Sequence, residues 1–202
     1  MLIRLARVQD QLRRVIADAP PGPIKIISVC AGQGHDVVAT LGDSPRRAAV
    51  RARLVEGDER NVAEARRKVA EAGLAGIEVC HGDAGLTDAY AGAVPARILL
   101  LCGVFGSLTD TDIDRLVAGL PQLCQANAQV IWTANRTAPE LYAEAEQAFR
   151  RYGFEPRWAD PEDHFGVTRH ELVGEPQPLQ PGRRLFDFAD EQTLIKLGRI
   201  AI

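Results

Sequence analysis

The sequence has little that would place the protein at a membrane or on a nucleic acid. No apolar run approaches the roughly 18 residues of a membrane-spanning helix, and the first residues lack the uninterrupted apolar block of a secretory signal. The 24 Lys and Arg against 27 Asp and Glu give a formal net charge of -3. Because no basic excess exists, we expect no polyanionic partner such as a nucleic acid.

The sequence has only four cysteines, and their spacing contains no paired motif. Cys30, Cys80, Cys102 and Cys124 lie far apart and form no C-x-x-C pair. Three of them end apolar runs, where reduced thiols pack as small hydrophobic groups. The spacing therefore predicts a reducing, cytoplasmic compartment. No set of His, Cys and carboxylates at metal-ligand spacing occurs either, so no metal site is predicted.

The length of 202 residues predicts one domain with a full core and a small appendage. The Arg-rich start also fits a mitochondrial transit peptide, but its apolar positions fit a docked helix better. Those positions are Leu5, Val8, Leu12, Val15 and Ile16. We expect a helix and linker at residues 1–23 packed on the domain, a main domain at 24–174 and a C-terminal extension at 175–202.

Between these ends, short apolar strands alternate with helical patterns. The strands are expected at 24–30, 51–56, 77–80, 96–102 and 128–134. Helices are expected from Asp36, over 58–73 with Asp58 as N-cap and Gly73 as the stop, briefly near 86–91, from Thr111 and over 138–153. Continuous apolar strands between helices predict a parallel sheet that is covered on both faces.

The end of the chain departs from this alternation. The segments "FEPRWAD" and "HFGVTRHELVG" predict two strands that are separated by the turn-forming "PED" and are therefore antiparallel. The Pro-rich tail is expected to be a loosely attached extension. The predicted fold is α/β, a doubly wound, Rossmann-like, seven-stranded and mostly parallel sheet with an antiparallel last strand.

A glycine loop, "CAGQGHD", follows the first strand. Gly32 and Gly34 would let a ligand approach the backbone, and the next helix N-terminus can receive an anionic group. Val37 stands near the position of the third glycine of an NAD fingerprint, which makes a dinucleotide the second choice. Glu56 ends the second strand, where a carboxylate can accept hydrogen bonds from ribose hydroxyls.

After the third strand, "HGDAG" places Asp83 and the backbone N–H of Ala84 where they could bind an adenine edge. The glycine loop, the carboxylate and this pair are expected at one edge of the sheet. Together they resemble the class I S-adenosylmethionine-dependent methyltransferases over residues 24–173. More narrowly, "SVCAGQGHD", "ARLVEGDERNVAEAR", "GDAGLTDAY", "LLCGVFGSLTDTD" and "VIWTANR" resemble small bacterial methyltransferase-domain proteins.

The resemblance implies S-adenosylmethionine as cofactor and assigns ten residues to it. Ala31, Gly32 and Gly34 would lie along its methionyl part, Glu56 and Gly57 at the ribose and Asp83 and Ala84 at the adenine. Cys102, Gly103 and Val104 would border the methionine moiety and the substrate.

This chain departs from the family pattern at three positions. Ser28 replaces an acidic residue, Cys30 a first glycine and Gly57 an apolar residue that often packs on the adenine. The adenine wall must then be thinner or come from elsewhere. Relatives also often carry an upstream segment that closes the pocket, so a lid is expected to be missing or to come from a partner chain, which leaves a homodimer open.

Methyl transfer needs alignment first, and a base only when the acceptor must lose a proton. Candidate substrate-binding residues are His35, Phe105, Trp132, Asn135, Arg136 and His164. Each has an ordinary alternative, such as local hydrogen bonding for His35, core packing for Trp132 and a solvated loop for Arg136 and His164. We assign no catalytic residue.

Three functional hypotheses follow from the sequence. The favoured one is a methyltransferase that acts on a small molecule. The second is a degenerate protein that binds the cofactor without methyl transfer, suggested by Ser28 and Cys30. The third is an NAD(P)-dependent oxidoreductase, against which the missing third glycine and the terminal hairpin argue.

Overall fold

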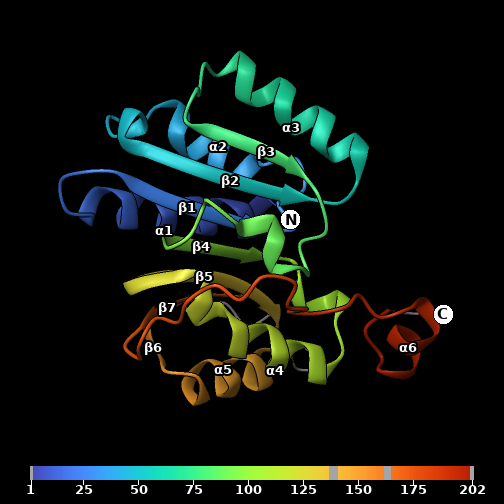
Figure 1. The fold of residues 1–202 in the computed structure, drawn as a ribbon. Coiled ribbons are helices and arrows are strands. Elements are labelled where there is room, and N and C mark those ends of the chain that lie inside the picture. Colours follow the sequence, from blue (N-terminus) through green and yellow to red (C-terminus); the bar gives the residue numbers. More distant parts are fainter. Residues whose placement is uncertain (1, 137–140, 162–164, 201–202) are drawn as a thin grey trace.

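The computed structural model describes residues 2–136, 141–161 and 165–200. They form a seven-stranded sheet of order β3-β2-β1-β4-β5-β7-β6 (Figure 1). Neighbouring strands are parallel except for β7, which is antiparallel to both β5 and β6. The strands are β1 (Ile24–Val29), β2 (Val50–Glu56), β3 (Ile77–His81), β4 (Ala96–Cys102), β5 (Cys124–Asn135), β6 (Phe154–Ala159) and β7 (Phe165–Leu172). The predicted fold class is confirmed.

Helices cover both faces of the sheet and bury two apolar cores. Helices α1, α2 and α3 contribute to one core, and α4 and α5 contribute to the other. Their bounds are α1 (Leu2–Asp18), α2 (His35–Gly42), α3 (Glu59–Glu71), α4 (Asp110–Gly119), α5 (Leu141–Arg151) and α6 (Glu191–Lys196). The short helix expected near residues 86–91 is a single 3-10 turn, Thr87–Tyr90. None of the described helices is long and apolar enough to cross a membrane.

The first helix is docked on the domain, as its apolar spacing predicts. Val8, Leu12, Val15 and Ile16 are buried. The guanidinium of Arg46 donates hydrogen bonds to carbonyls at the end of this helix, including that of Ile16 at 3.0 Å. The last carbonyls of a helix have no hydrogen-bond partner within it, so the guanidinium of Arg46 fixes where the chain turns toward β1.

The C-terminal segment differs from the expectation. The backbone N–H of Gln177 donates to the carbonyl of Pro121, and that of Ala189 to the carbonyl of Ser107. Between them, Leu185 and Phe186 are almost fully buried. The expectation of loose attachment is therefore wrong from residue 177 to residue 189. In Figure 1 this segment, in red, crosses the molecule toward the side where β2, β3 and β4 end.

Candidate functional site

A cleft of 710 Å³ lies where β1, β2 and β3 end. In open α/β sheets, ligands bind at this edge. Its walls come from the loops after these three strands and from the C-terminal segment. The lining residues are Cys30, Glu56, Gly57, Asp58, His81, Gly82, Asp83, Ala84, Arg184, Phe186, Asp187 and Phe188. Four of the residues that the sequence assigns to the cofactor, Glu56, Gly57, Asp83 and Ala84, are among them.

The loop after β1 turns on residues with positive φ. Cys30, Gly32 and Gly34 have φ of 54°, 55° and 67°. A side chain on Gly34 would also bring its Cβ within 2.7 Å of Leu54 Cδ2, whereas open space surrounds Gly32. Gly34 is thus required by both conformation and packing. Cys30 keeps the same turn without a glycine, at a cost of about 1 kcal/mol.

Glu56 joins this loop to the loop after β2. Its Oε2 accepts the backbone N–H of Gly32 at 2.7 Å, and its Oε1 accepts that of Asp58 at 2.8 Å. Asp58 has a different task, because its carboxylate accepts the backbone N–H groups of Arg60 and Asn61 and caps α3. The predicted cap is confirmed. The two acidic residues, two positions apart, therefore serve different elements.

Asp83 joins the loop after β3 to the C-terminal segment. Its Oδ1 accepts the backbone N–H of Gly85 at 2.8 Å, and its Oδ2 accepts Arg184 Nη1 at 2.5 Å. The neighbouring Ala84 accepts the hydroxyl of Tyr90 at 2.6 Å through its carbonyl. The carboxylate expected at the adenine edge thus already holds a cation from the C-terminal segment.

The residues predicted after β4 lie elsewhere. Val104 is buried in the core and Cys102 is half-buried. Gly103 lines a second cavity, of 200 Å³. The rest of that cavity is lined by Arg4, Gly106, Thr133, Ala134, Asn135, Leu141 and Arg199. Of the ten predicted cofactor residues, four therefore line the cleft and Gly103 lines the smaller cavity, whereas Ala31, Gly32, Gly34, Cys102 and Val104 line neither.

Two predicted substrate residues are core residues. Phe105 and Trp132 are fully buried, with ring centroids 5.6 Å apart. The indole N–H of Trp132 donates to Nδ1 of the buried His170 at 2.9 Å. Neither aromatic ring offers a surface that a substrate could contact, so we remove both from the candidate site. The core-packing alternative for Trp132 agrees with this geometry.

The other predicted substrate residues are dispersed. The Nε2 atom of His35 lies 2.9 Å from Lys68 Nζ and 3.2 Å from Gln33 Oε1, which is the local hydrogen bonding offered as its alternative role. The guanidinium of Arg136 lies over the ring of Tyr142 at 4.2 Å. His164 lies outside the described residues.

Burial raises the pKa of two groups in and beside the loop after β1. It raises the pKa of the Cys30 thiol to about 12, with help from the carboxylates of Glu56 and Asp83. The thiol is therefore neutral near pH 7 and a poor nucleophile. Asp36, at the start of α2, is buried, and burial raises its pKa also. Within the described part of the chain, no group of three or more His, Cys, Asp or Glu could hold a metal ion.

Sequence analysis missed the C-terminal wall of the cleft. Arg184, Phe186, Asp187 and Phe188 all line it. Their stretch, "RLFDF", holds three apolar residues, Leu185, Phe186 and Phe188, and this short cluster is a local sign of a segment with buried side chains. Its place in the Pro-rich tail concealed that sign.

Comparisons with known proteins agree with this architecture. The family model described as "Putative methyltransferase" matches residues 1–152. No curated protein matches the chain by sequence. The solved CurJ carbon methyltransferase is similar with a TM-score of 0.70 and 11% identity, over 84% of this chain and 54% of that one. The chain thus spans about half the length of that protein.

Two further solved structures are similar. Magnesium protoporphyrin IX methyltransferase from Synechocystis PCC 6803, solved with bound S-adenosylmethionine, has a TM-score of 0.64 and 12% identity, over 84% of this chain and 79% of that one. The cyclase SpnF has a TM-score of 0.60 and 12% identity, over 85% of this chain and 81% of that one. Such identities carry information on the fold alone. Because the family model covers well over half of the chain, the chain belongs to this methyltransferase family, and it has the fold of the class I S-adenosylmethionine-dependent methyltransferases.

Proposed function

We propose that the protein binds S-adenosylmethionine in the cleft and transfers its methyl group to a small-molecule acceptor. One observation carries the proposal: the carboxylate that ends β2, the glycine loop after β1 and the Asp83–Ala84 pair converge at one edge of the sheet. This is the set that a nucleoside with a charged tail requires. The cleft volume of 710 Å³ also lies within the usual range of about 300–1,000 Å³ for small-ligand sites.

The residues of the cleft fit an adenosine group. Glu56 accepts one backbone hydrogen bond at each oxygen, and a carboxylate oxygen has capacity for a second. A vicinal pair of ribose hydroxyls can use that capacity. The two backbone bonds fix the orientation of the carboxylate before any ligand arrives, which reduces the entropy lost on binding.

When bound, the cofactor supplies a methyl group on a sulfonium sulfur, which leaves as the neutral thioether S-adenosylhomocysteine. The chain then has to align the acceptor and exclude competing nucleophiles. Cys30 is one nucleophilic side chain that lines the cleft, and burial, together with the Glu56 and Asp83 carboxylates, raises the pKa of its thiol to about 12 and keeps it protonated. A protonated thiol competes poorly with the acceptor for the methyl group.

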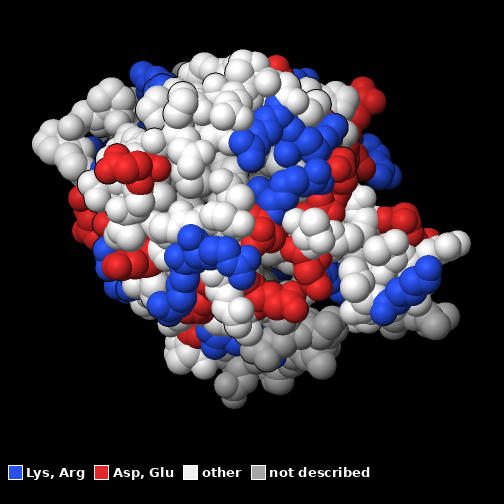
Figure 2. Space-filling view, turned by 60° about the horizontal axis from the view of Figure 1, so that its bottom comes forward, with Lys and Arg blue, Asp and Glu red and all other residues white. Residues whose placement is uncertain are grey.

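The charge distribution supports a small acceptor over a polyanion. On the face shown in Figure 2, Lys and Arg side chains lie among Asp and Glu side chains. The formal net charge of the chain is -3. Counterion release from a nucleic acid requires many cations on one surface, so this pattern offers little affinity for such a partner.

A second candidate function is cofactor binding without methyl transfer. Ser28, where the family often has an acidic residue, is buried in β1, and Cys30 occupies a position that favours glycine. The cyclase SpnF, which is similar in fold alone, has a name that states another reaction, so the fold by itself does not imply methyl transfer.

Two measurements on the full chain test the proposal. S-adenosylhomocysteine at 100 times its dissociation constant is expected to stabilise the protein by about 2.7 kcal/mol, which raises Tm by roughly 5–10 °C. NADH at the same concentration is expected to leave Tm unchanged. A rise with NADH alone would refute the reasoning.

Turnover distinguishes the two candidates. The protein is incubated with labelled S-adenosylmethionine and pools of small-molecule acceptors, and release of S-adenosylhomocysteine is measured. Acceptor-dependent release supports methyl transfer. Tight binding of S-adenosylhomocysteine with no release across acceptors that present oxygen, nitrogen, carbon and sulfur nucleophiles would favour the second candidate.

A further inference from the structure

The C-terminal segment at residues 184–188, here called the strap, is built into the wall of the cleft. It forms an antiparallel bridge in which Arg184 pairs with Leu86. The backbone N–H of Leu185 donates to the carbonyl of Gly85 at 2.7 Å. Gly85 has no room for a side chain, because a Cβ there would lie 2.4 Å from the carbonyl oxygen of Phe186. The strap therefore rests directly on the loop that carries Asp83 and Ala84.

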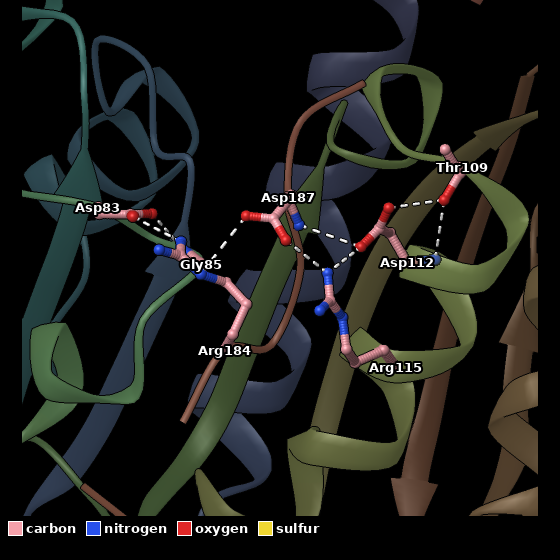
Figure 3. A network of polar contacts seen from close by, with 7 residues as sticks. All are labelled: Asp83, Gly85, Thr109, Asp112, Arg115, Arg184 and Asp187. Carbon is pink, nitrogen blue, oxygen red and sulfur yellow. Dashed lines mark hydrogen bonds and ion pairs between the residues drawn. The ribbon is translucent and has the colours of Figure 1, made fainter. Parts of the chain in front are cut away.

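A chain of ion pairs holds the strap at both ends (Figure 3). Arg184 pairs with Asp83 at 2.5 Å and with Asp187 at 3.4 Å. Asp187 in turn accepts Arg115 Nη2 of α4 at 2.8 Å, and its backbone N–H donates to Asp112 at 3.1 Å. Exposed ion pairs are weak singly, but a network of this kind fixes the position of the segment that carries it.

The two aromatic residues of the strap have different environments. Phe186 is 1% exposed and packs in the core, whereas Phe188 is 58% exposed. Their rings meet edge to face with centroids 5.4 Å apart. Phe188 thus has one edge supported by a buried ring and much of its surface in solvent. An exposed aromatic ring that is held in a cleft wall is a surface for a planar apolar group.

Outside the strap, the one ring among the cleft-lining residues is the imidazole of His81, whose Nε2 lies 3.1 Å from the carbonyl oxygen of Gly57. The loops after β2 and β3 contribute Gly57, Gly82 and Ala84, and their other lining residues are polar. The carboxylate of Glu56 lies on one side of the cleft and the ring of Phe188 belongs to the strap on another. A nucleoside, which has hydroxyls on its ribose and a flat ring in its base, can contact both.

We propose that the strap is part of the cofactor site and that Phe188 stacks on the nucleobase. This inference rests on the proposed function and adds to it a binding residue from the C-terminal segment. In this arrangement Asp83 is a positioning residue, because its carboxylate holds Arg184 and so places the strap. Stacking of a base on an aromatic side chain has no requirement for hydrogen bonds from that side chain, which suits phenylalanine.

Calorimetry with adenosine and S-adenosylhomocysteine tests the proposal on four full-length proteins. They are the unchanged protein, Phe188→Ala, Phe188→Tyr and the control Val173→Ala. The control removes an apolar side chain of comparable exposure, 48%, at the end of β7. Phe188→Ala is expected to weaken both ligands by the same factor, about 5- to 150-fold. Phe188→Tyr restores most of the affinity, and Val173→Ala leaves it unchanged.

A second readout follows the strap itself. Trypsin cleaves after Arg183 or Arg184 when the strap leaves the body of the protein. Saturating S-adenosylhomocysteine is expected to slow this cleavage in the unchanged protein and much less in Phe188→Ala. Equal protection of both proteins would overturn the stacking role.

The outcomes separate the two proposals. If the unchanged protein binds both ligands and Phe188→Ala binds them equally well, the strap proposal fails and the proposed function stands. If the unchanged protein binds neither ligand, both fail. A loss of affinity that Phe188→Tyr does not restore would also count against stacking.

Discussion

Replacing Glu56 tests the structure of the site most directly. The carboxylate accepts the N–H of Gly32 at 2.7 Å and that of Asp58 at 2.8 Å, so it holds two loops together before any ligand binds. Hydrogen bonds to a charged group contribute about 1.5–3 kcal/mol. Glu56→Ala is therefore expected to lower the free energy of unfolding by roughly 2 kcal/mol, or Tm by about 4–8 °C. Sequence reasoning alone predicts little change in Tm, because it does not include these backbone contacts.

The same substitution is expected to weaken the binding of S-adenosylhomocysteine by about 10- to 150-fold, since the charge-assisted bonds to the ribose are also lost. Asp58→Ala is the matched control. It removes the cap of α3 and costs about 1 kcal/mol of stability, while binding changes little. Urea denaturation measures the stabilities and calorimetry the dissociation constants. A greater loss of affinity in Asp58→Ala than in Glu56→Ala would refute the assignment of the ribose carboxylate.

Two further predictions concern stability. Burial lowers the pKa of His170 from 6.5 to about 4, so the folded state binds a proton less readily than the unfolded state. The free energy of unfolding therefore has its full value above pH 7 and should fall by about 2 kcal/mol by pH 5. Urea denaturation at pH 8 and pH 5 checks this, and His170→Gln should lose that part of the pH dependence. Gly34→Ala should cost about 2 kcal/mol or more, because its Cβ meets Leu54 in addition to the positive φ, whereas Gly32→Ala should cost only about 1 kcal/mol. Equal losses in the two glycine variants would contradict the packing argument.

The sheet could be predicted because its signals are local. Each strand from β1 to β5 is a short apolar run that turn residues or helix caps bound, and Asp58 lies directly before the helix that it caps. The antiparallel arrangement of β6 and β7 follows from their short connection. The predicted bounds differ from the structure where the backbone is irregular, as in β5, which begins at Cys124 and not at the expected Ala128.

The side-chain directions in apolar runs could not be predicted in the same way. Trp132 in β5 faces the core of α4 and α5, while its neighbour Ile131 faces the core of α1, α2 and α3. Both faces of this sheet are covered, so alternation along the strand gives no solvent side from which to choose a ligand-binding residue. Strand position alone therefore made Trp132 a substrate candidate.

The strap shows a different limit of sequence reasoning. Arg184 and Asp83, which pair at 2.5 Å, are 101 residues apart. This pair, the contacts of Asp187 and the backbone hydrogen bonds of Leu185 and Ala189 place Phe188 at the cleft. Composition predicts only a Pro-rich tail, since most of the contacts that order this segment are with residues far away in the sequence. The strap also gives a physical reason for Gly57. A Cβ at that position would meet only the carbonyl of Gly82, at 3.8 Å, so glycine is not required there by packing. If Phe188 stacks on the base as proposed, the strap supplies an aromatic wall in place of an apolar side chain at position 57, and segments far apart in the sequence share one binding surface.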